Sequence, residues 1–316
     1  MKVLANDGIS QSGINALEKA GFKVNTTTVA QEQLINYINE HQISVLLVRS
    51  ATKVRKDLID ACPSLKIIGR GGVGMDNIDV EYAKEKGLKV INTPAASSHS
   101  VAELVFAHLY GLARYLHNAN RDMPLEGDSK FKDLKKAYAK GTELKGKTIG
   151  ILGFGRIGQA TAKVAIGSGM NIIAYDPFIE EVNLELSFFD GQKLNFNIKT
   201  ISKESVLKQS DFITLHVPAQ KDYVIGTSEF ELMKDGVIIV NAARGGVIDE
   251  VALINSIENG KVARAALDVF EKEPQPEVQL LMNPALSLTP HTGAATNEAQ
   301  DRIGTELATQ IISILK

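Results

Sequence analysis

Residues 148–158 read Thr148-Ile149-Gly150-Ile151-Leu152-Gly153-Phe154-Gly155-Arg156-Ile157-Gly158, and this stretch decides the fold. An apolar run leads into three glycines at GxGxxG spacing, and a helical pattern follows to residue 166. A second apolar run, residues 171–175, ends at Asp176. Strand, glycine loop, helix, strand and acid in this order predict a βαβ unit that binds a dinucleotide.

Each part of this unit has a physical role. Gly153 permits the tight turn, Gly155 lets a pyrophosphate approach the backbone, and Gly158 lets the helix lie close to the strand. The helix N-terminus, beginning at Arg156 and Ile157, offers unpaired N–H groups and the positive end of its dipole to phosphates. A carboxylate at Asp176 accepts hydrogen bonds from a ribose 2′-hydroxyl and repels a 2′-phosphate. The sequence therefore predicts NAD as the cofactor.

Composition excludes several classes of function. The 316 residues carry 35 Lys and Arg against 37 Asp and Glu, a net charge of −2, so no basic excess indicates a nucleic-acid or membrane partner. A single cysteine, Cys62, cannot form an internal disulfide, and the first residues resemble an opening strand rather than a signal peptide. No apolar run approaches the roughly 18 residues of a membrane span. Together these features lead us to expect a cytoplasmic protein. The six histidines lack Cys or acidic partners at ligand spacing, so we expect no metal site.

The first hundred residues alternate short apolar runs with helical patterns, which is typical of repeated βαβ units. We expect an α/β protein with two doubly wound parallel-sheet domains, the larger a Rossmann NAD-binding domain inserted into a flavodoxin-like substrate domain. The predicted boundaries are 1–97 with 293–316 for the substrate-binding domain and 98–292 for the NAD-binding domain. The final helix, residues 297–315, should pack back on the first domain.

One segment after Asp176 departs from the simple βαβ pattern. Residues 182–188 and 194–198 alternate apolar and polar positions on either side of Asp190-Gly191. Such alternation around Asp-Gly predicts a β-hairpin, either a surface decoration or a lid near the adenosine end of the cofactor.

Three residues that can carry chemistry follow predicted strands: Arg244, Glu273 and His291. In an open α/β sheet, ligands sit beyond the carboxyl ends of the strands. A guanidinium can clamp a carboxylate through two parallel hydrogen bonds, and an imidazole can move a proton near neutral pH. With a carboxylate to stabilise the imidazolium, these residue types suit the oxidation of a 2-hydroxy acid.

Around these residues the chain resembles the D-isomer-specific 2-hydroxyacid dehydrogenases. The resemblance is carried by the segments 241–246 (NAARGG), 267–274 (LDVFEKEP), 290–294 (PHTGA) and 70–79 (RGGVGMDNID). It covers nearly the whole chain and, within the family, is closest to the D-3-phosphoglycerate dehydrogenases. It implies catalytic roles for Arg244, Glu273 and His291, with Glu273 rather than Glu271 as the acid because it directly precedes a proline. Residues implied to line the cofactor are Gly153, Gly155, Arg156, Ile157, Gly158, Asp176, His216, Val217, Ala242, Asp268 and His291.

The same resemblance indicates where the substrate binds. The loop Arg70, Gly71, Gly72, Val73 and Gly74 supplies backbone N–H groups for a carboxylate. Arg49, in the segment 48–54, matches the arginine that contacts the phosphate in phosphoglycerate dehydrogenases, and Lys136 is a weaker candidate from a neighbouring subunit. One departure is Ser97, which stands where that subfamily commonly has asparagine.

We therefore expect NAD-dependent oxidation of 3-phospho-D-glycerate to 3-phosphohydroxypyruvate, a step of serine biosynthesis. One alternative is a glyoxylate or hydroxypyruvate reductase, or another D-2-hydroxyacid dehydrogenase. Another is an NAD-sensing module like the corepressors of this family. The resemblance also implies a homodimer or homotetramer, with residues 100–115 as a seam or as core. Because the serine-binding domain of longer relatives does not follow residue 316, feedback inhibition through it is not expected.

Overall fold

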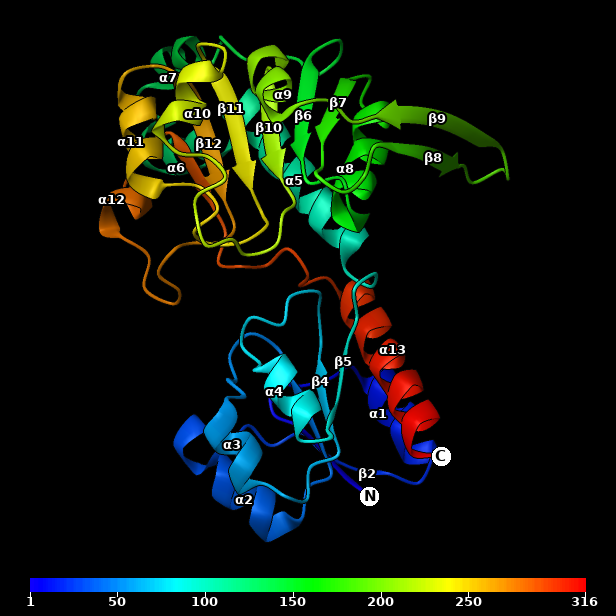
Figure 1. The fold of residues 1–316 in the computed structure, drawn as a ribbon. Coiled ribbons are helices and arrows are strands. Elements are labelled where there is room, and N and C mark those ends of the chain that lie inside the picture. The colour runs from blue at the N-terminus through cyan, green and yellow to red at the C-terminus, as the bar shows by residue number, and fades with distance from the viewer. The chain divides into compact units, whose positions relative to one another are not determined.

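The computed structural model describes all 316 residues, which divide into two compact units (Figure 1). Unit 1 comprises Met1–Ser100 and Ala294–Lys316, and unit 2 comprises Val101–Gly293. The chain thus leaves unit 1 once, builds unit 2 and returns. None of the helices is both long and apolar enough to span a membrane.

Unit 1 is built around a parallel sheet of five strands in the order β2-β1-β3-β4-β5. The strands are β1 (Lys2–Ala5), β2 (Lys23–Asn25), β3 (Val45–Val48), β4 (Ile67–Arg70) and β5 (Lys89–Asn92). One face packs on α2 (Leu34–His41), which follows the short helix η1 (Gln31–Gln33), and on α3 (Lys56–Ala61) and α4 (Val80–Glu85). The other face packs on α1 (Gln11–Lys19) and α13 (Asn297–Leu315).

The return of α13 to unit 1 confirms the predicted packing of the final helix. Ile303, Leu307 and Ile311 of α13 are buried in the same core as β1 and β3. The backbones of α1 and α13 approach so closely that a Cβ on Gly13 would lie 2.8 Å from the carbonyl oxygen of Gly304. Glycine at this crossing therefore sets the spacing of the two helices.

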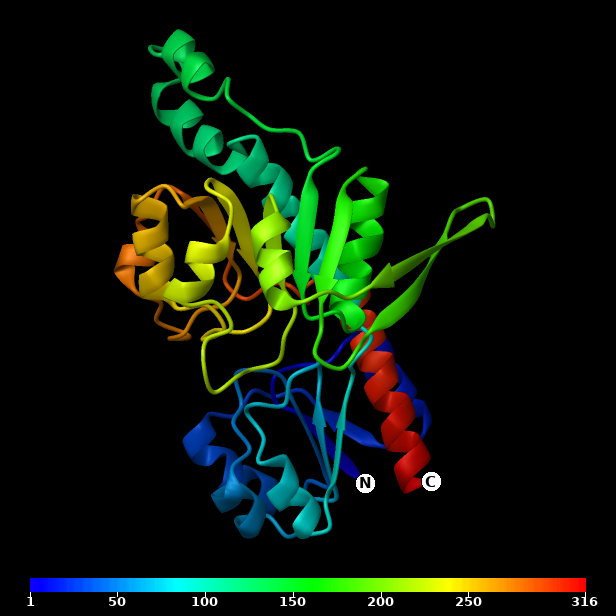
Figure 2. The same cartoon turned by 45° about the horizontal axis from the view of Figure 1, so that its top comes forward.

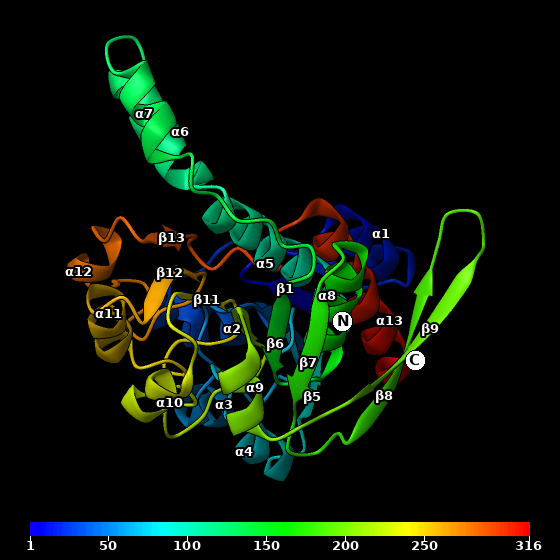
Figure 3. The ribbon, with the colours of Figure 1, turned by 90° about the horizontal axis from the view of Figure 1, so that it is seen from above.

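Unit 2 contains a parallel sheet of six strands in the order β13-β12-β11-β10-β6-β7. The strands are β6 (Thr148–Leu152), β7 (Asn171–Tyr175), β10 (Phe212–Leu215), β11 (Val237–Asn241), β12 (Val262–Leu267) and β13 (Leu286–Leu288). One face packs on α5 (Ser98–Ala113) and α8 (Arg156–Gly167), as Figure 3 shows from above. The opposite face packs on α9 (Lys203–Gln209), α10 (Thr227–Leu232) and α11 (Glu250–Glu258). The short helix α12 (Val278–Leu281) precedes β13.

The two sheets confirm the predicted α/β architecture, with the larger domain inserted into the smaller. Strand order β2-β1-β3 and β7-β6-β10 shows the switch point that doubly wound sheets place beside their ligands. The assignment of 1–97 with 293–316 to substrate, and of 98–292 to cofactor, stays a prediction.

The hairpin predicted at 182–198 is confirmed. Strands β8 (Glu181–Ser187) and β9 (Lys193–Lys199) pair antiparallel, and Gly191 takes a left-handed φ of 84° in the turn. The base of the hairpin packs Leu184 and Phe196 against the core under α8, whereas its tip leaves Phe189 exposed. Figure 2 shows the hairpin projecting from unit 2.

A second projection is the helical arm formed by α6 (Leu116–Glu126) and α7 (Phe131–Ala137) (Figure 3). No residue of α6 is buried, and Leu134 is the buried residue of α7. Large apolar side chains on the arm stay exposed: Leu116, Met123, Leu125 and Phe131.

Candidate active site

The glycine loop of unit 2 has the geometry of a phosphate cradle. Gly155 is the N-cap of α8 and has no side chain to cap it, so the first N–H groups of the helix are available to a ligand. A Cβ on Gly155 would meet nothing within 4 Å, so open space lies over this turn. Gly153 has φ of 92°, and a Cβ on it would lie 2.5 Å from the carbonyl oxygen of His216. Gly158 is needed for packing, because its Cβ would lie 2.2 Å from the oxygen of Gly153.

Asp176 follows β7 and turns its carboxylate toward this loop. Its Oδ2 accepts a hydrogen bond from the N–H of Phe154 at 2.7 Å, and its Oδ1 accepts one from Phe178 at 2.9 Å. These bonds fix the carboxylate beside the glycines. Of the helix residues expected at the cofactor, Arg156 is exposed and Ile157 is half-buried at the start of α8.

His216 and Val217 follow β10, and Ala242 follows β11, so all three lie at the carboxyl ends of neighbouring parallel strands. The Nε2 atom of His216 is 3.1 Å from Thr161 Oγ1 and 3.2 Å from Thr214 Oγ1. Burial lowers the pKa of His216 to about 3, so this imidazole is neutral at physiological pH. His216 Nδ1 is enclosed without a hydrogen-bond partner.

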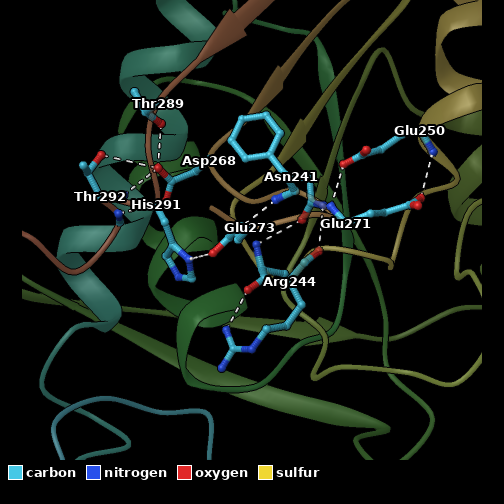
Figure 4. Close-up of polar contacts among 12 residues, drawn as sticks. Asn241, Arg244, Glu250, Asp268, Glu271, Glu273, Thr289, His291 and Thr292 are labelled. Carbon is cyan, nitrogen blue, oxygen red and sulfur yellow. Dashed lines mark hydrogen bonds and ion pairs between the residues drawn. The ribbon is translucent and has the colours of Figure 1, made fainter. Parts of the chain in front are cut away.

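His291 and Glu273 form a hydrogen-bonded dyad in unit 2 (Figure 4). The Nδ1 atom of His291 lies 2.8 Å from Oε2 of Glu273, and the other carboxylate oxygen accepts the N–H of Phe270 at 3.1 Å. Burial opposes ionisation of Glu273, but the hydrogen bond and charge of His291, the Phe270 N–H and the charge of Arg244 outweigh it. The pKa of Glu273 is therefore lowered.

Glu271, two residues before Glu273, has different partners. Its carboxylate accepts the N–H of Glu250 at 3.2 Å, and its own N–H donates to the Glu250 carboxylate at 2.8 Å (Figure 4). Burial, with the charge of Glu271, raises the pKa of Glu250. The geometry thus distinguishes the two glutamates. Glu273 contacts the imidazole of His291, whereas Glu271 bonds to Glu250 at the start of α11.

Arg244 lies in the loop after β11, near the dyad (Figure 4). Its backbone oxygen accepts a hydrogen bond from Asn241 Nδ2 at 3.0 Å, which holds the loop in shape. Its guanidinium donates from Nη1 to the carbonyl oxygen of Ala243 at 2.7 Å. The structure therefore brings Arg244, Glu273 and His291 into one region of unit 2.

Asp268 holds this region together through several hydrogen bonds, a structural role that the sequence did not predict. The buried carboxylate accepts hydrogen bonds from Thr289 Oγ1 at 2.6 Å, from the N–H of Thr292 at 2.7 Å and from that of Gly293 at 2.8 Å. These bonds tie the loop on both sides of His291, which has a left-handed φ of 55°. The signal that could have indicated it is an acid directly after the buried apolar end of a strand, residues 265–267.

A cavity of about 440 Å³ adjoins the dyad. Glu273 and His291 form its polar part, and most of the remaining wall is apolar: Phe270, Pro274, Pro276, Leu281, Leu288 and Pro290, with Thr289. No group of His, Cys, Asp and Glu side chains is placed to hold a metal ion.

In unit 1, the candidate substrate residues lie on adjacent loops. Because β3 and β4 pair in parallel, Arg49 and the loop 70–74 leave the same edge of the sheet. Asp7 accepts the N–H of Arg49 at 2.6 Å, and Asn77 Nδ2 donates to the oxygen of Arg49 at 2.7 Å. Arg49 is half-buried, and its guanidinium has no hydrogen-bond or ion-pair partner.

The loop that begins at Arg70 packs against the side chain of Arg70. Arg70 Nη1 donates to the oxygen of Gly71 at 3.0 Å. Gly72 has φ of 144°, a backbone conformation that favours glycine, and it lies against the end of the Arg70 side chain. Asn92 Nδ2 holds the oxygen of Val73 at 2.8 Å, leaving Gly74 half-buried at the end of the loop.

Comparison with known proteins decides the family. The model of the D-isomer specific 2-hydroxyacid dehydrogenase NAD-binding domain matches residues 106–293. A hydroxypyruvate reductase of Thermotoga maritima is 44% identical over 99% of this chain and 98% of its own length. The chain belongs to the D-isomer specific 2-hydroxyacid dehydrogenase family.

Other relatives of the family bear different names. A D-3-phosphoglycerate dehydrogenase of Methanocaldococcus jannaschii is 43% identical over the whole chain, which spans 58% of that protein's length. Among solved structures, a glyoxylate reductase from Paecilomyes thermophila is 31% identical, with a TM-score of 0.81 over 100% of this chain and 95% of that one.

The family match confirms the prediction of NAD as the cofactor, and the glycine loop with Asp176 suits it. It also supports NAD-dependent dehydrogenase activity on a 2-hydroxy acid. Relatives named for phosphorylated and for unphosphorylated acids are about equally similar, so the similarity does not distinguish the substrate.

Proposed function

We propose that this 2-hydroxyacid dehydrogenase oxidises 3-phospho-D-glycerate to 3-phosphohydroxypyruvate, as in serine biosynthesis. The observation that carries the proposal is the Arg49 guanidinium. The residue is half-buried, its guanidinium has no acidic partner, and Asp7 and Asn77 hold its backbone in place. Partly burying a cation without a counter-charge costs free energy, and a phosphate ligand would recover it through charge-assisted hydrogen bonds.

The carboxylate of the substrate is assigned to backbone N–H groups of Gly71, Gly72, Val73 and Gly74. Gly71 lies against Arg49, since a Cβ on Gly71 would be 3.6 Å from Arg49 Cγ. A C3 acid with a phosphate at one end and a carboxylate at the other would thus find cationic or N–H partners for both groups.

The proton of the 2-hydroxyl is assigned to His291. Because Nδ1 of His291 is engaged by Glu273, Nε2 is the atom left to take the proton from the hydroxyl and return it in reduction. The Glu273 carboxylate stabilises the imidazolium that results, and Arg244 orients the substrate. Bound at residues 153–158 and Asp176, NAD supplies the acceptor for the hydride.

A second candidate is reduction of hydroxypyruvate or glyoxylate, favoured by the similarity to the Thermotoga maritima hydroxypyruvate reductase. Ser97 gives it further support, because a short hydroxyl replaces the amide that phosphoglycerate dehydrogenases commonly present. The two candidates share Arg244, Glu273 and His291 and differ in what Arg49 contacts.

Steady-state reduction of 3-phosphohydroxypyruvate, hydroxypyruvate and glyoxylate with NADH tests the proposal. Arg49→Ala should lower kcat/KM for the phosphorylated acid by about 10- to 100-fold, the loss of one charge-assisted contact, and leave the other two within about twofold. Lys53→Ala, an exposed cation of the same segment, is the matched control and should change none of them. Equal losses on all three acids would refute the phosphate assignment. No turnover of any 2-keto acid would favour the NAD-sensing alternative.

We further propose that the protein is a homodimer or homotetramer and that a second subunit packs on the arm α6–α7. Isolated helices of this length are marginal in water, and Leu125 and Phe131 are 80% and 56% exposed on this arm. Sedimentation of the wild type and of Leu125→Asp should show a larger assembly for the former and a smaller one for the latter. Equal sedimentation would contradict the use of the arm.

A further inference from the structure

We infer that His108, a buried histidine of α5, is a positioning residue for the loop that presents His291. This inference rests on the proposed function, because it assigns His108 an effect on proton transfer by His291. His108 touches neither the dyad nor the glycine loop, and its effect passes through Thr289 and Asp268.

The contacts form a continuous chain within unit 2. Nε2 of His108 lies 3.1 Å from Oγ1 of Thr289, and Oγ1 of Thr289 lies 2.6 Å from the Asp268 carboxylate. On its other side, Nδ1 of His108 lies 2.9 Å from Oγ of Ser287. Both hydroxyls belong to the last strand and the residue after it, directly before Pro290 and His291.

The direction of each hydrogen bond follows from the chemistry of the groups. The Asp268 carboxylate accepts the hydrogen bond from Thr289, so the single hydroxyl proton of Thr289 points to it. Thr289 Oγ1 must then accept from His108, which requires a proton on Nε2. In a neutral imidazole Nδ1 carries no proton and accepts from the hydroxyl of Ser287.

The neutral state of His108 agrees with its surroundings. Burial lowers the pKa of His108, the charge of Asp268 opposes this, and His117 reinforces it. At 5% exposure the ring has little access to water. His108 therefore holds one tautomer, with a fixed donor toward Thr289 and a fixed acceptor toward Ser287.

The fixed donor has a consequence for His291. The Asp268 carboxylate holds the N–H groups of Thr292 and Gly293, the two residues after His291. His291 keeps a left-handed backbone, which costs a non-glycine residue free energy and persists only where neighbouring bonds impose it. By donating to the Thr289 hydroxyl, His108 also fixes the hydrogen bond that this hydroxyl donates to the Asp268 carboxylate. His108 thus links helix α5 to the placement of the imidazole.

The alternative is that His108 only fills space between α5 and β13. Amide isosteres separate the two cases. The amide of His108→Gln reaches the position of Nε2 and can donate to Thr289, whereas that of His108→Asn reaches the position of Nδ1 and Ser287. His108→Leu removes both polar contacts and keeps the apolar packing.

The test is steady-state reduction of the 2-keto acid that the wild type uses best, with NADH and at saturating substrate. His108→Leu and His108→Asn should lower kcat about tenfold, in the range produced by small misplacements of a catalytic group, and leave KM for NADH within about twofold. His108→Gln should keep kcat within about threefold of wild type. Thr289→Val should lower kcat like His108→Leu, and the double variant should be no slower than either single one, because all three break one chain.

Several outcomes would overturn the inference. These are an unchanged kcat in His108→Leu, equal losses in the Gln and Asn variants, or multiplied losses in the double variant. If His108→Leu does not fold, the Gln and Asn pair still decides, together with Thr289→Ser, which keeps the hydroxyl and should match wild type. A wild type that turns over no 2-keto acid would defeat the proposed function itself, and an active wild type with indifferent His108 variants would defeat only the role of His108.

Discussion

The dyad makes a sharp prediction about Glu273→Gln. Glutamine keeps the length of the side chain and can still accept a hydrogen bond from His291 Nδ1, but it removes the negative charge. We expect proton transfer to slow in both directions, because the imidazolium formed in oxidation and required in reduction loses its counter-charge.

The magnitude follows from distance and exposure. At 2.8 Å the pair is a charge-assisted hydrogen bond whenever the imidazole is protonated, and such bonds contribute about 1.5–3 kcal/mol. The His291 and Glu273 side chains are 37% and 35% exposed, so water screens the pair and the lower end applies. A loss of about 1.4 kcal/mol in transition-state stabilisation lowers kcat about tenfold.

The assay is NADH consumption with a saturating 2-keto acid, and Glu271→Gln is the matched control. Glu271 lies two residues away and bonds to the backbone of Glu250, so its neutral variant should stay within about twofold of wild type in kcat. If Glu271→Gln slows the reaction as much as Glu273→Gln, or if Glu273→Gln has no effect, the assignment of the acid is wrong.

The pH dependence of stability gives a second readout of the same pair. Because the pKa of Glu273 is lowered in the folded protein, its ionised carboxylate stabilises the fold above its unfolded value of about 4.3. This contribution is lost as pH falls through the folded pKa. The difference in unfolding free energy between wild type and Glu273→Gln should therefore shrink as the pH falls below about 5.

Three further predictions concern the cofactor loop, a buried imidazole and the hairpin. Asp176→Ala should raise KM for NADH about tenfold or more and reduce discrimination against NADPH, since it removes the carboxylate that we expect to accept hydrogen bonds from the ribose; unchanged discrimination would contradict that role. His216 is neutral when folded, with a pKa of about 3, whereas it takes up a proton when unfolded below about pH 6.5. Lowering the pH from 7 to 5 should therefore remove about 2 kcal/mol of unfolding free energy from wild type that His216→Gln does not lose, measured by urea titration at both values. Gly191→Val should lower unfolding free energy by about 1–2 kcal/mol because valine rarely adopts a φ of 84°, while Gly167→Ala, with open space around it in α8, should be neutral or stabilising. A stable Gly191→Val protein would mean that the hairpin turn is not under this constraint.

Local patterns were sufficient for most of the fold. The βαβ unit at 148–176 was predictable because glycine spacing, apolar periodicity and the terminal acid all have short-range causes. The hairpin was predictable for the same reason, since alternation and Asp-Gly at its turn each favour antiparallel pairing. The break between α6 and α7 was not predicted, because the few apolar residues of this mostly polar segment give no clear periodic signal.

The site was predictable only as a set of residue types. Arg244, Glu273 and His291 stand out because they follow strands, but strand ends do not tell which of Glu271 and Glu273 turns toward the imidazole. That choice depends on how the backbone turns between residues 270 and 274, where the Phe270 N–H holds one oxygen of Glu273. Resemblance to the family selected Glu273, and the geometry places it, not Glu271, against His291.

The hydrogen bonds that connect His108, Thr289 and Asp268 to the loop of His291 could not be predicted from the sequence. The members of this network are separated by up to 185 residues between His108 and Gly293, and each looks ordinary alone: a histidine on a helix, a threonine after a strand, an acid before Val269. They become connected because β12 and β13 pair in register, which puts Asp268 beside Thr289, and because α5 covers that end of the sheet. An imidazole in a strained backbone needs such a brace, since the φ of His291 is unfavourable unless neighbouring hydrogen bonds impose it. The residues to which we assign the chemistry are therefore visible in the sequence, whereas those that hold them in place depend on the pairing of the strands.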